Sequence, residues 1–168
     1  MQFGSTIYLD YQATTPLDPR VIDKMAASHE LSFANPHSTQ HVLGQQAAGE
    51  VDQARAEIEA LIGAEQEEVI FTSGATEANN QAIASVLMAS KAQRKKLLIS
   101  AIEHKCIKNA AYFYADKFGA TVEEIPVLDS GLIDIEAYQS MLSDAVCLVC
   151  IMAVNNEIGT IQDIPTLA

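Results

Sequence analysis

Basic residues are scarce in this chain of 168 residues. Lysine and arginine together number 10 against 22 aspartates and glutamates, so the formal net charge is −12. A surface this acidic repels a phosphate backbone, which argues against a nucleic-acid-binding protein. The one basic cluster, Lys91 with residues 94–96, lies at the end of a predicted helix. The helix dipole favours cations there, so we interpret the cluster as a solvated helix end.

Long apolar runs and cysteine frameworks are also missing. No apolar segment approaches the ~20 residues of a membrane-spanning helix. Residues 1–4 lack the charged and apolar regions of a secretory signal, so we expect a cytoplasmic protein. Three cysteines in a chain of this length do not form a disulfide framework. Cys147 and Cys150 are three apart on a predicted strand and should face opposite sides, so we expect two core cysteines rather than a metal or redox pair.

Helical and strand patterns alternate along the chain. Apolar residues make up 49% of the sequence, enough for a sizeable core in a chain the size of one domain. Asp18-Pro19 is typical of a helix start, and Gly63 of a helix end. Further helices are expected at 44–62, 76–90, 106–117 and 134–142, and strands at 69–72, 97–101, 121–127 and 145–154. Strands separated by helices predict an α/β fold with a mostly parallel sheet, and the nearly unbroken apolar run 145–154 is typical of a central strand.

A strand, a tight turn and a helix start follow one another between residues 69 and 76. The turn contains Gly74, which tolerates positive φ, and the hydroxyl of Thr76 can cap the helix. Such a corner aims unpaired N–H groups and the positive end of the helix dipole at one point, which suits a phosphate. The turn has neither the lysine of a Walker loop nor the three glycines of a dinucleotide fingerprint. A plain strand-to-helix corner is the alternative.

Polar residues follow three of the predicted strands, at 73–76, 102–105 and 155–159. Ligands of parallel α/β sheets bind beyond the carboxyl ends of the strands. We therefore expect the phosphate site, the imidazole of His104 and the carboxamide of Asn155 at one edge of the sheet. Taken alone, His104 is equally typical of a helix start near a surface loop. Cys106 lies close by, and we interpret it as a structural residue rather than a nucleophile.

Two histidines raise the question of a metal. His37 and His41 are four apart, a spacing that suits a metal pair on a helix. Asn35-Pro36 indicates a loop there, and no third ligand is evident, so we predict no metal site.

Five segments together carry a family likeness. They resemble, in this order and over essentially the whole chain, the group I cysteine desulfurases of the NifS/IscS type, within the class V aminotransferase-like enzymes. The resemblance implies the type I pyridoxal-phosphate (PLP) fold, with residues 1–168 as an N-terminal arm plus the first part of the PLP-binding large domain, incomplete at the C-terminus. The segments are Ile7–Pro16, Asn35–Ser38, Phe71–Glu77, Glu103–Lys105 and Val154–Gly159.

The resemblance also implies roles for individual residues. Ala75 and Thr76 would hold the PLP phosphate, His104 would stack on the pyridine ring and shuttle protons, and Asn155 would hydrogen-bond the ring hydroxyl. The reaction would convert L-cysteine to L-alanine and leave sulfur as an enzyme persulfide for iron–sulfur cluster assembly or other sulfur transfer. Members of the family form homodimers and pass sulfur to scaffold proteins.

Three parts of the family's chemistry have no counterpart in this sequence. The Schiff-base lysine of a Ser-Gly-His-Lys segment, the aspartate that pairs with the pyridine nitrogen and the cysteine that takes the sulfur are absent. We therefore expect the chain alone to be inactive and to bind PLP weakly or not at all. The predicted strand 69–72 would lack its sheet neighbour, so we also expect self-association. A selenocysteine lyase or another class V PLP enzyme is the related alternative, and a non-catalytic half-domain for assembly or partner binding is the alternative of another class.

Overall fold

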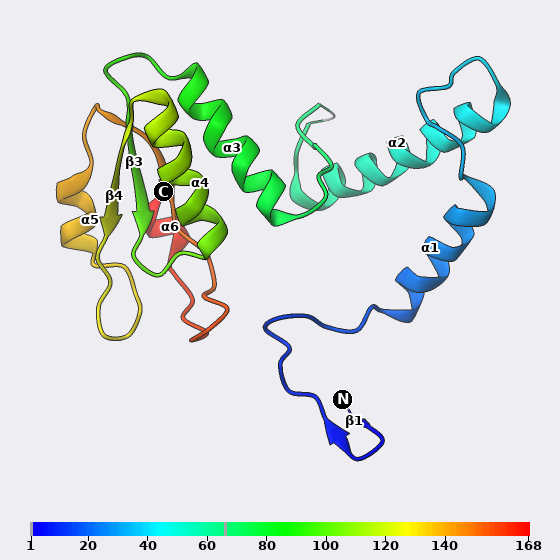
Figure 1. Cartoon of the computed structure of the whole chain (residues 1–168), viewed down its shortest axis with the longest axis horizontal. Coiled ribbons are helices and arrows are strands. Elements are labelled where there is room, and N and C mark those ends of the chain that lie inside the picture. The colour runs from blue at the N-terminus through cyan, green and yellow to red at the C-terminus, as the bar shows by residue number, and fades with distance from the viewer. Residues whose placement is uncertain (1, 66) are drawn as a thin grey trace. The chain divides into compact units, whose positions relative to one another are not determined.

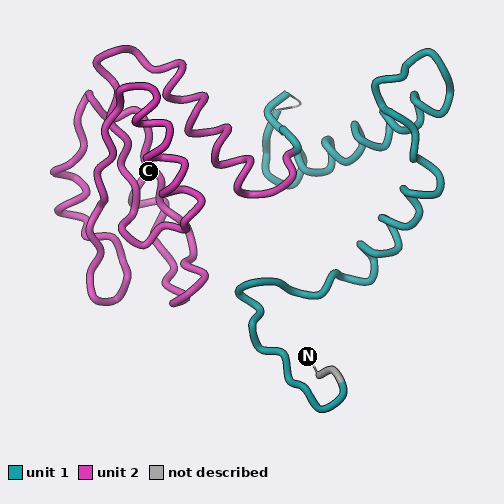
Figure 2. The backbone as a smooth tube through the Cα atoms, in the orientation of Figure 1, with its two compact units in different colours: residues 1–71 teal, residues 72–168 magenta. Residues whose placement is uncertain are grey.

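The structure, a computed structural model, describes residues 2–65 and 67–168. The chain divides into two compact units, Met1–Phe71 and Thr72–Ala168, which Figure 2 draws in different colours. The candidate site residues His104 and Asn155 belong to the second unit, as do Ala75 and Thr76.

The first unit consists of a short hairpin and two helices (Figure 1). β1 (Gln2–Phe3) pairs antiparallel with β2 (Thr6–Ile7). The helices are α1 (Pro19–Leu31) and α2 (Val42–Ile62). No helix in the described part of the chain is both long enough and apolar enough to cross a membrane.

Local capping chemistry sets the ends of these helices. The Asp18 side chain accepts the N–H of Arg20 at 2.8 Å, and Pro19 occupies the first helical position, which confirms the predicted helix start. Gly63 ends α2 with φ 69°, also as predicted. α2 begins two residues before the predicted start because the imidazole of His41 caps it, with Nδ1 accepting the N–H of Gly44 at 3.0 Å.

The helices of the first unit bury little. No residue of α1 is buried, and its apolar stripe Val21, Ile22 and Met25 is about half exposed. In α2 only Gly44 and Ala47 are buried. The sequence pattern thus forms two capped helices whose apolar side chains are left largely in solvent.

The second unit is an α/β layer structure. Its three-stranded sheet has the order β4-β3-β5, and both pairings are parallel. This arrangement confirms the predicted parallel α/β fold. Its elements are α3 (Ala75–Ala89), β3 (Lys96–Ser100), α4 (Lys105–Phe118), β4 (Thr121–Ile125), α5 (Ile135–Met141), β5 (Val146–Cys150) and α6 (Ile164–Leu167).

Helices cover both faces of this sheet, and β3 provides core residues to each (Figure 1). Leu97 and Ile99 belong to the cluster that includes residues of α3 and α4, whereas Leu98 belongs to the cluster with α5 and α6. This alternation follows from the two-residue period of a strand. All three side chains are completely buried, so β3 is the centre of the unit.

The prediction that the apolar run 145–154 is the central strand is wrong. β5 pairs only with β3 in the described sheet, and the side chains of residues 147–152 are half-buried. An apolar run indicates that a segment can be buried. The order of strands in the sheet depends instead on pairing between segments that are distant in the sequence.

The predicted strand at 69–72 is also absent from the described structure. The carbonyl of Val69 instead accepts a hydrogen bond from the guanidinium of Arg55 at 3.3 Å. A β-branched apolar segment forms a strand only when a neighbour completes its backbone hydrogen bonds, and no such neighbour pairs with it here.

A register shift in β5 overturns the expectation for its two cysteines. Leu97 lies opposite Leu148, whereas the residue before it in β3 lies opposite Val146, so Cys147 is an extra residue in the ladder. As a result Cys147 and Cys150 pack against the same core cluster rather than on opposite faces. Both are half-buried free thiols. The pKa of Cys150 is raised to about 11, and burial is the main cause.

Candidate functional site

The start of α3 presents three unpaired backbone donors. Gly74 is the N-cap, with φ 157° and ψ −179°, so the positive φ expected for this glycine is confirmed. The expected hydroxyl cap from Thr76 is wrong, because the helix begins one residue earlier. Among the described residues, no acceptor is found for the N–H groups of Ala75, Thr76 and Glu77, and the next amide, of Ala78, bonds to the Gly74 carbonyl at 3.1 Å. Three free N–H groups at the positive end of a 15-residue helix suit an anion.

The turn before α3 carries its own internal hydrogen bonds. The N–H of Ser73 donates to Glu77 Oε2 at 2.6 Å. Hydrogen bonds from the side chain and backbone of Ser73 hold the pKa of Glu77 below its ordinary value. The Ser73 amide is therefore occupied, and the donors that remain for an anion are those of the first helical turn.

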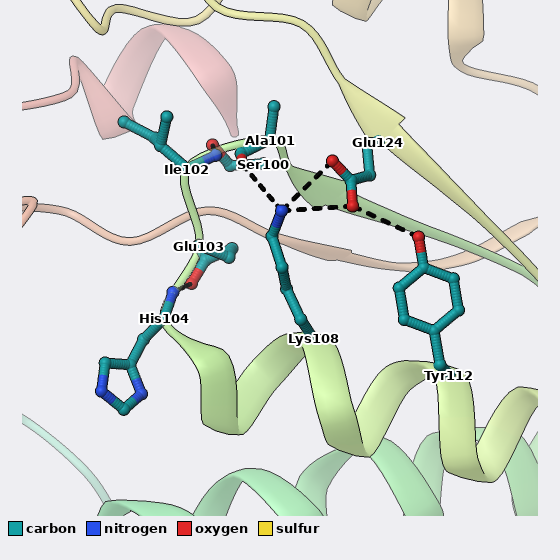
Figure 3. A network of polar contacts seen from close by, with 8 residues as sticks. All are labelled: Ser100, Ala101, Ile102, Glu103, His104, Lys108, Tyr112 and Glu124. Carbon is teal, nitrogen blue, oxygen red and sulfur yellow. Dashed lines mark hydrogen bonds and ion pairs between the residues drawn. The ribbon is translucent and has the colours of Figure 1, made fainter.

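His104 is the N-cap of α4. Its Nδ1 accepts the backbone N–H of Cys106 at 3.1 Å and lies 3.0 Å from the Cys106 Sγ. The imidazole is exposed, and Figure 3 shows it at the start of α4, pointing away from Lys108 and Glu124. An exposed aromatic ring held at a helix start offers a face on which a flat ligand can stack.

Glu103, directly before His104, is a buried carboxylate with only 8% of its surface exposed. Its Oε2 accepts the backbone N–H of His104 at 3.2 Å, while Oε1 has no partner among the described residues. Burial raises the pKa of Glu103, and hydrogen bonds from the backbones of Met152 and His104 oppose that rise. The carboxylate thus accepts a hydrogen bond at the start of α4 and keeps one oxygen buried without a partner in the described residues.

An ion pair fixes the same loop from the side of β4 (Figure 3). Lys108 Nζ donates to the Ala101 carbonyl at 2.8 Å and lies 3.2 Å from Glu124 Oε1. The hydroxyl of Tyr112 donates to Glu124 Oε1 at 3.2 Å. These contacts hold the loop between β3 and α4 in one conformation and thereby set the position of His104.

Asn155 is buried, with 6% of its surface exposed, at the end of the segment that follows β5. Its Nδ2 donates to the Ile102 carbonyl at 3.0 Å, and its Oδ1 accepts the N–H groups of Glu157 and Ile158 at 2.9 and 3.0 Å. The other contact of Nδ2 is the sulfur of Met152 at 3.2 Å. An amide has two N–H donors and a thioether is a weak acceptor, so one donor of Asn155 is free for a better acceptor.

Hydrogen bonds connect the three predicted parts of the site. Asn79, one turn into α3, donates to Cys106 Sγ at 3.2 Å. The backbone N–H of Cys106 in turn donates to Nδ1 of His104. Asn155 bonds to the carbonyl of Ile102, two residues before His104. Hydrogen bonds therefore link α3, the loop that carries His104 and the segment that carries Asn155 beyond the carboxyl ends of β3 and β5.

Sequence reasoning assigned no role to Asn79, Glu103 or Lys108. The position of Asn79 one turn after Ala75, on the same face of α3, is a signal that could have found it. Lys108 lies on α4 and its partner Glu124 lies on β4, so no local pattern shows this pair.

His37 and His41, the pair considered as metal ligands, lie next to local hydrogen bonds in the first unit. The N–H of His37 donates to Asn35 Oδ1 at 2.9 Å in the predicted loop, and His41 caps α2. The described residues contain no group of three or more histidine, cysteine, aspartate or glutamate side chains placed to hold a metal ion.

Comparison with known proteins identifies the family. Residues 7–168 match the family described as aminotransferase class-V. The chain belongs to this family. Cysteine desulfurase IscS of Rickettsia bellii (strain OSU 85-389) is 45% identical to this class-V chain over 156 residues, which cover 93% of the chain and 38% of the relative. The corresponding protein of Rickettsia felis (strain ATCC VR-1525 / URRWXCal2) is 42% identical over the same coverage.

Solved structures give the same family and fold. A NifS-like protein aligns with a TM-score of 0.90 and 31% identity, covering 96% of this class-V chain and 44% of that protein. SspA in complex with cysteine aligns with a TM-score of 0.87 and 36% identity, covering 96% and 46%. The predicted likeness to NifS/IscS-type proteins and the predicted fold class are confirmed. The chain spans less than half the length of these relatives.

Proposed function

We propose that this chain provides the cofactor-binding edge of a PLP-dependent cysteine desulfurase. The enzyme would convert L-cysteine to L-alanine and retain the sulfur as a persulfide for iron–sulfur cluster assembly or another sulfur transfer. In this proposal the chain is the N-terminal arm and the first part of the PLP-binding large domain. The observation that supports it is that the segments carrying three free amides, an exposed imidazole and a buried carboxamide are linked by hydrogen bonds.

The residues present fit PLP. The free N–H groups of Ala75 and Thr76, at the positive end of α3, suit its phosphate dianion. The exposed imidazole of His104 suits stacking on a pyridine ring, and the available N–H of Asn155 suits a ring hydroxyl. When bound, PLP supplies an electron sink for bond cleavage at the amino acid, and the protein provides orientation and charge.

The chain's own residues have separate tasks in this proposal. The α3 amides anchor one end of the ligand, and Asn155 fixes its rotation by a directed hydrogen bond. His104 holds the ring plane and exchanges protons through Nε2, the imidazole nitrogen that has no hydrogen bond in the described structure. Lys108 and Glu103 keep the loop that carries His104 in place.

We further propose L-cysteine as substrate, a second copy of the enzyme and a sulfur-accepting scaffold protein as partners, and the cytoplasm as location. One solved relative, SspA, has a structure in complex with cysteine, which supports the substrate. The exposed apolar side chains of α1 and α2 are consistent with a surface that pairs in a dimer or with the rest of the enzyme.

Sulfide and alanine release from L-cysteine tests the activity. The 168-residue chain with added PLP should release neither, because it has no Ser-Gly-His-Lys segment. A polypeptide that joins these residues to such a segment should release both in equal amounts. Turnover by the 168-residue chain would contradict the expected inactivity. Preference for selenocysteine, or amino transfer without sulfide, in the longer polypeptide would favour the alternative class V enzymes.

Backbone amide resonances of the chain test the binding site directly. PLP should bind weakly and reversibly and shift the amides of residues 75–77. Ala75→Pro removes one N–H at the first helical position, where a proline fits, and it should reduce the shifts. Thr76→Ala removes only the hydroxyl and should preserve them. Equal loss in both variants, or shifts confined to other regions, would contradict amide binding of the phosphate.

A further inference from the structure

The imidazole of His104 has a defined hydrogen-bonding polarity. Its Nδ1 accepts the backbone N–H of Cys106 at 3.1 Å. A ring nitrogen that accepts a hydrogen bond carries no proton, so the neutral ring has its hydrogen on Nε2. The Sγ of Cys106 lies 3.0 Å from the same Nδ1. With the backbone N–H already directed at Nδ1, the thiol can only add a second donor there.

Asn79 determines which way the thiol hydrogen points. Its Nδ2, on α3, lies 3.2 Å from Cys106 Sγ. An amide nitrogen only donates, so the sulfur is the acceptor in this contact and its own hydrogen is directed elsewhere. The polarity therefore runs from Asn79 N–H to Sγ, and from S–H to His104 Nδ1.

We propose that Asn79 and Cys106 are positioning residues that hold the His104 imidazole in its Nε2–H form. Two donors at Nδ1, the backbone N–H and the thiol of Cys106, exclude a proton from that nitrogen. Proton exchange with a ligand then runs through Nε2 alone. The importance of the Nε2–H form for catalysis rests on the proposed function of His104. The tautomer itself is a property of the chain without cofactor.

His41 provides an internal reference for the thiol contribution. Its Nδ1 accepts the N–H of Gly44 at 3.0 Å at the start of α2. The two histidines thus share a backbone donor at Nδ1, and only His104 has in addition a cysteine sulfur 3.0 Å away. The difference between their Nδ1 resonances isolates the effect of the sulfur.

Imidazole ¹⁵N spectroscopy of the full 168-residue chain, at a pH where the rings are neutral, tests the proposal. In the wild type, His104 should show the proton on Nε2, with its Nδ1 resonance upfield of that of His41. Cys106→Ala removes the thiol and should move the His104 Nδ1 resonance to the His41 position. Cys106→Ser restores a donor and should return it.

Asn79→Asp is the more specific variant because it replaces the hydrogen-bond donor to Cys106 Sγ by an acceptor. A carboxylate accepts the thiol hydrogen and turns it away from Nδ1, so this variant should match Cys106→Ala although Cys106 is intact. Asn80→Ala, at the neighbouring position of α3, should leave the His104 resonances unchanged, and His41 should be unchanged in every variant. Methyl resonances of Leu98 and Ile99 verify that each variant is folded.

Two results would overturn the proposal. One is a proton on Nδ1 of His104 in the wild type, which requires no variant. The other is a His104 Nδ1 resonance that stays at the wild-type position in folded Cys106→Ala and Asn79→Asp. Neither measurement uses PLP or turnover. Failure of the proposed desulfurase activity would therefore leave the positioning result standing, and the converse also holds.

Discussion

The two units of the chain form their helices by the same local rules but bury very different amounts of apolar surface. In the described part of the chain, Ala47 is the one buried apolar residue of the first unit, and all others lie in the second. Leu61 of the first unit is 83% exposed, whereas Leu98 of the second is completely buried. Caps and patterning are sufficient to specify a helix, but packing against a sheet supplies the stability.

The residues proposed for function follow the same division between the two units. The second unit contains every residue proposed to hold the cofactor, and Lys108 and Asn155 make hydrogen bonds to the loop before α4. The first unit offers exposed apolar helix faces instead. We expect the second unit to unfold cooperatively and the first to contribute little to the same transition.

The largest expected effect comes from the sheet core. Leu98→Ala empties a site with no solvent exposure, which costs about 2–5 kcal/mol of the free energy of unfolding. Leu61→Ala removes an exposed side chain and should change it by no more than about 0.5 kcal/mol. Urea titrations followed by circular dichroism measure both. Similar losses in the two variants would contradict the contrast between the units.

Removing the Asn155 side chain should have the next largest effect. Asn155→Ala leaves the Ile102 carbonyl and the N–H groups of Glu157 and Ile158 without their partners. Unsatisfied buried groups cost about 1–3 kcal/mol in the free energy of unfolding. Asn156→Ala changes an exposed neighbour and is the matched control in the same urea titration. An equal loss from both would show that the buried amide does not join the two strand ends.

Helix caps should behave differently in the two units. Asp134 Oδ1 accepts the N–H of Ala137 at 3.0 Å at the start of α5, so Asp134→Ala should cost about 1 kcal/mol in the urea transition of the second unit. Asp18 caps α1 in the same way. Asp18→Ala should lower the helical signal but leave the midpoint of that transition in place. A matching shift of the midpoint would show that the units unfold together.

The smallest expected effect is a pH dependence at Glu103. Its pKa is raised, chiefly by burial, so the folded chain binds this proton more tightly than the unfolded chain. The group's contribution to stability is complete below the ordinary glutamate pKa and is lost as pH rises through the raised value. Relative to Glu103→Gln, the wild type should therefore lose stability from acid towards neutral pH in urea titrations. A difference between them that does not change with pH would contradict the burial of this carboxyl.

Local chemistry in the sequence was enough to predict much of the fold. Asp18, Gly63 and Asp134 act through hydrogen bonds or backbone angles within a few residues, so the ends of their helices were predicted closely. The alternation of helices and strands likewise predicted a parallel sheet. The closeness of the loop before His104 to Asn155 followed from that topology, because parallel strands end at one edge, whereas residues 73–76 follow a segment that forms no strand.

The tertiary structure alone decided which segments became neighbours. It placed β3 rather than β5 at the centre of the sheet, left residues 69–72 unpaired and inserted Cys147 as an extra residue in its strand. It also joined Asn79 to Cys106 across two helices. Each of these features depends on partners distant in the sequence. Capping and periodicity act within one or two turns, whereas strand pairing and side-chain contacts between elements are set by packing in three dimensions.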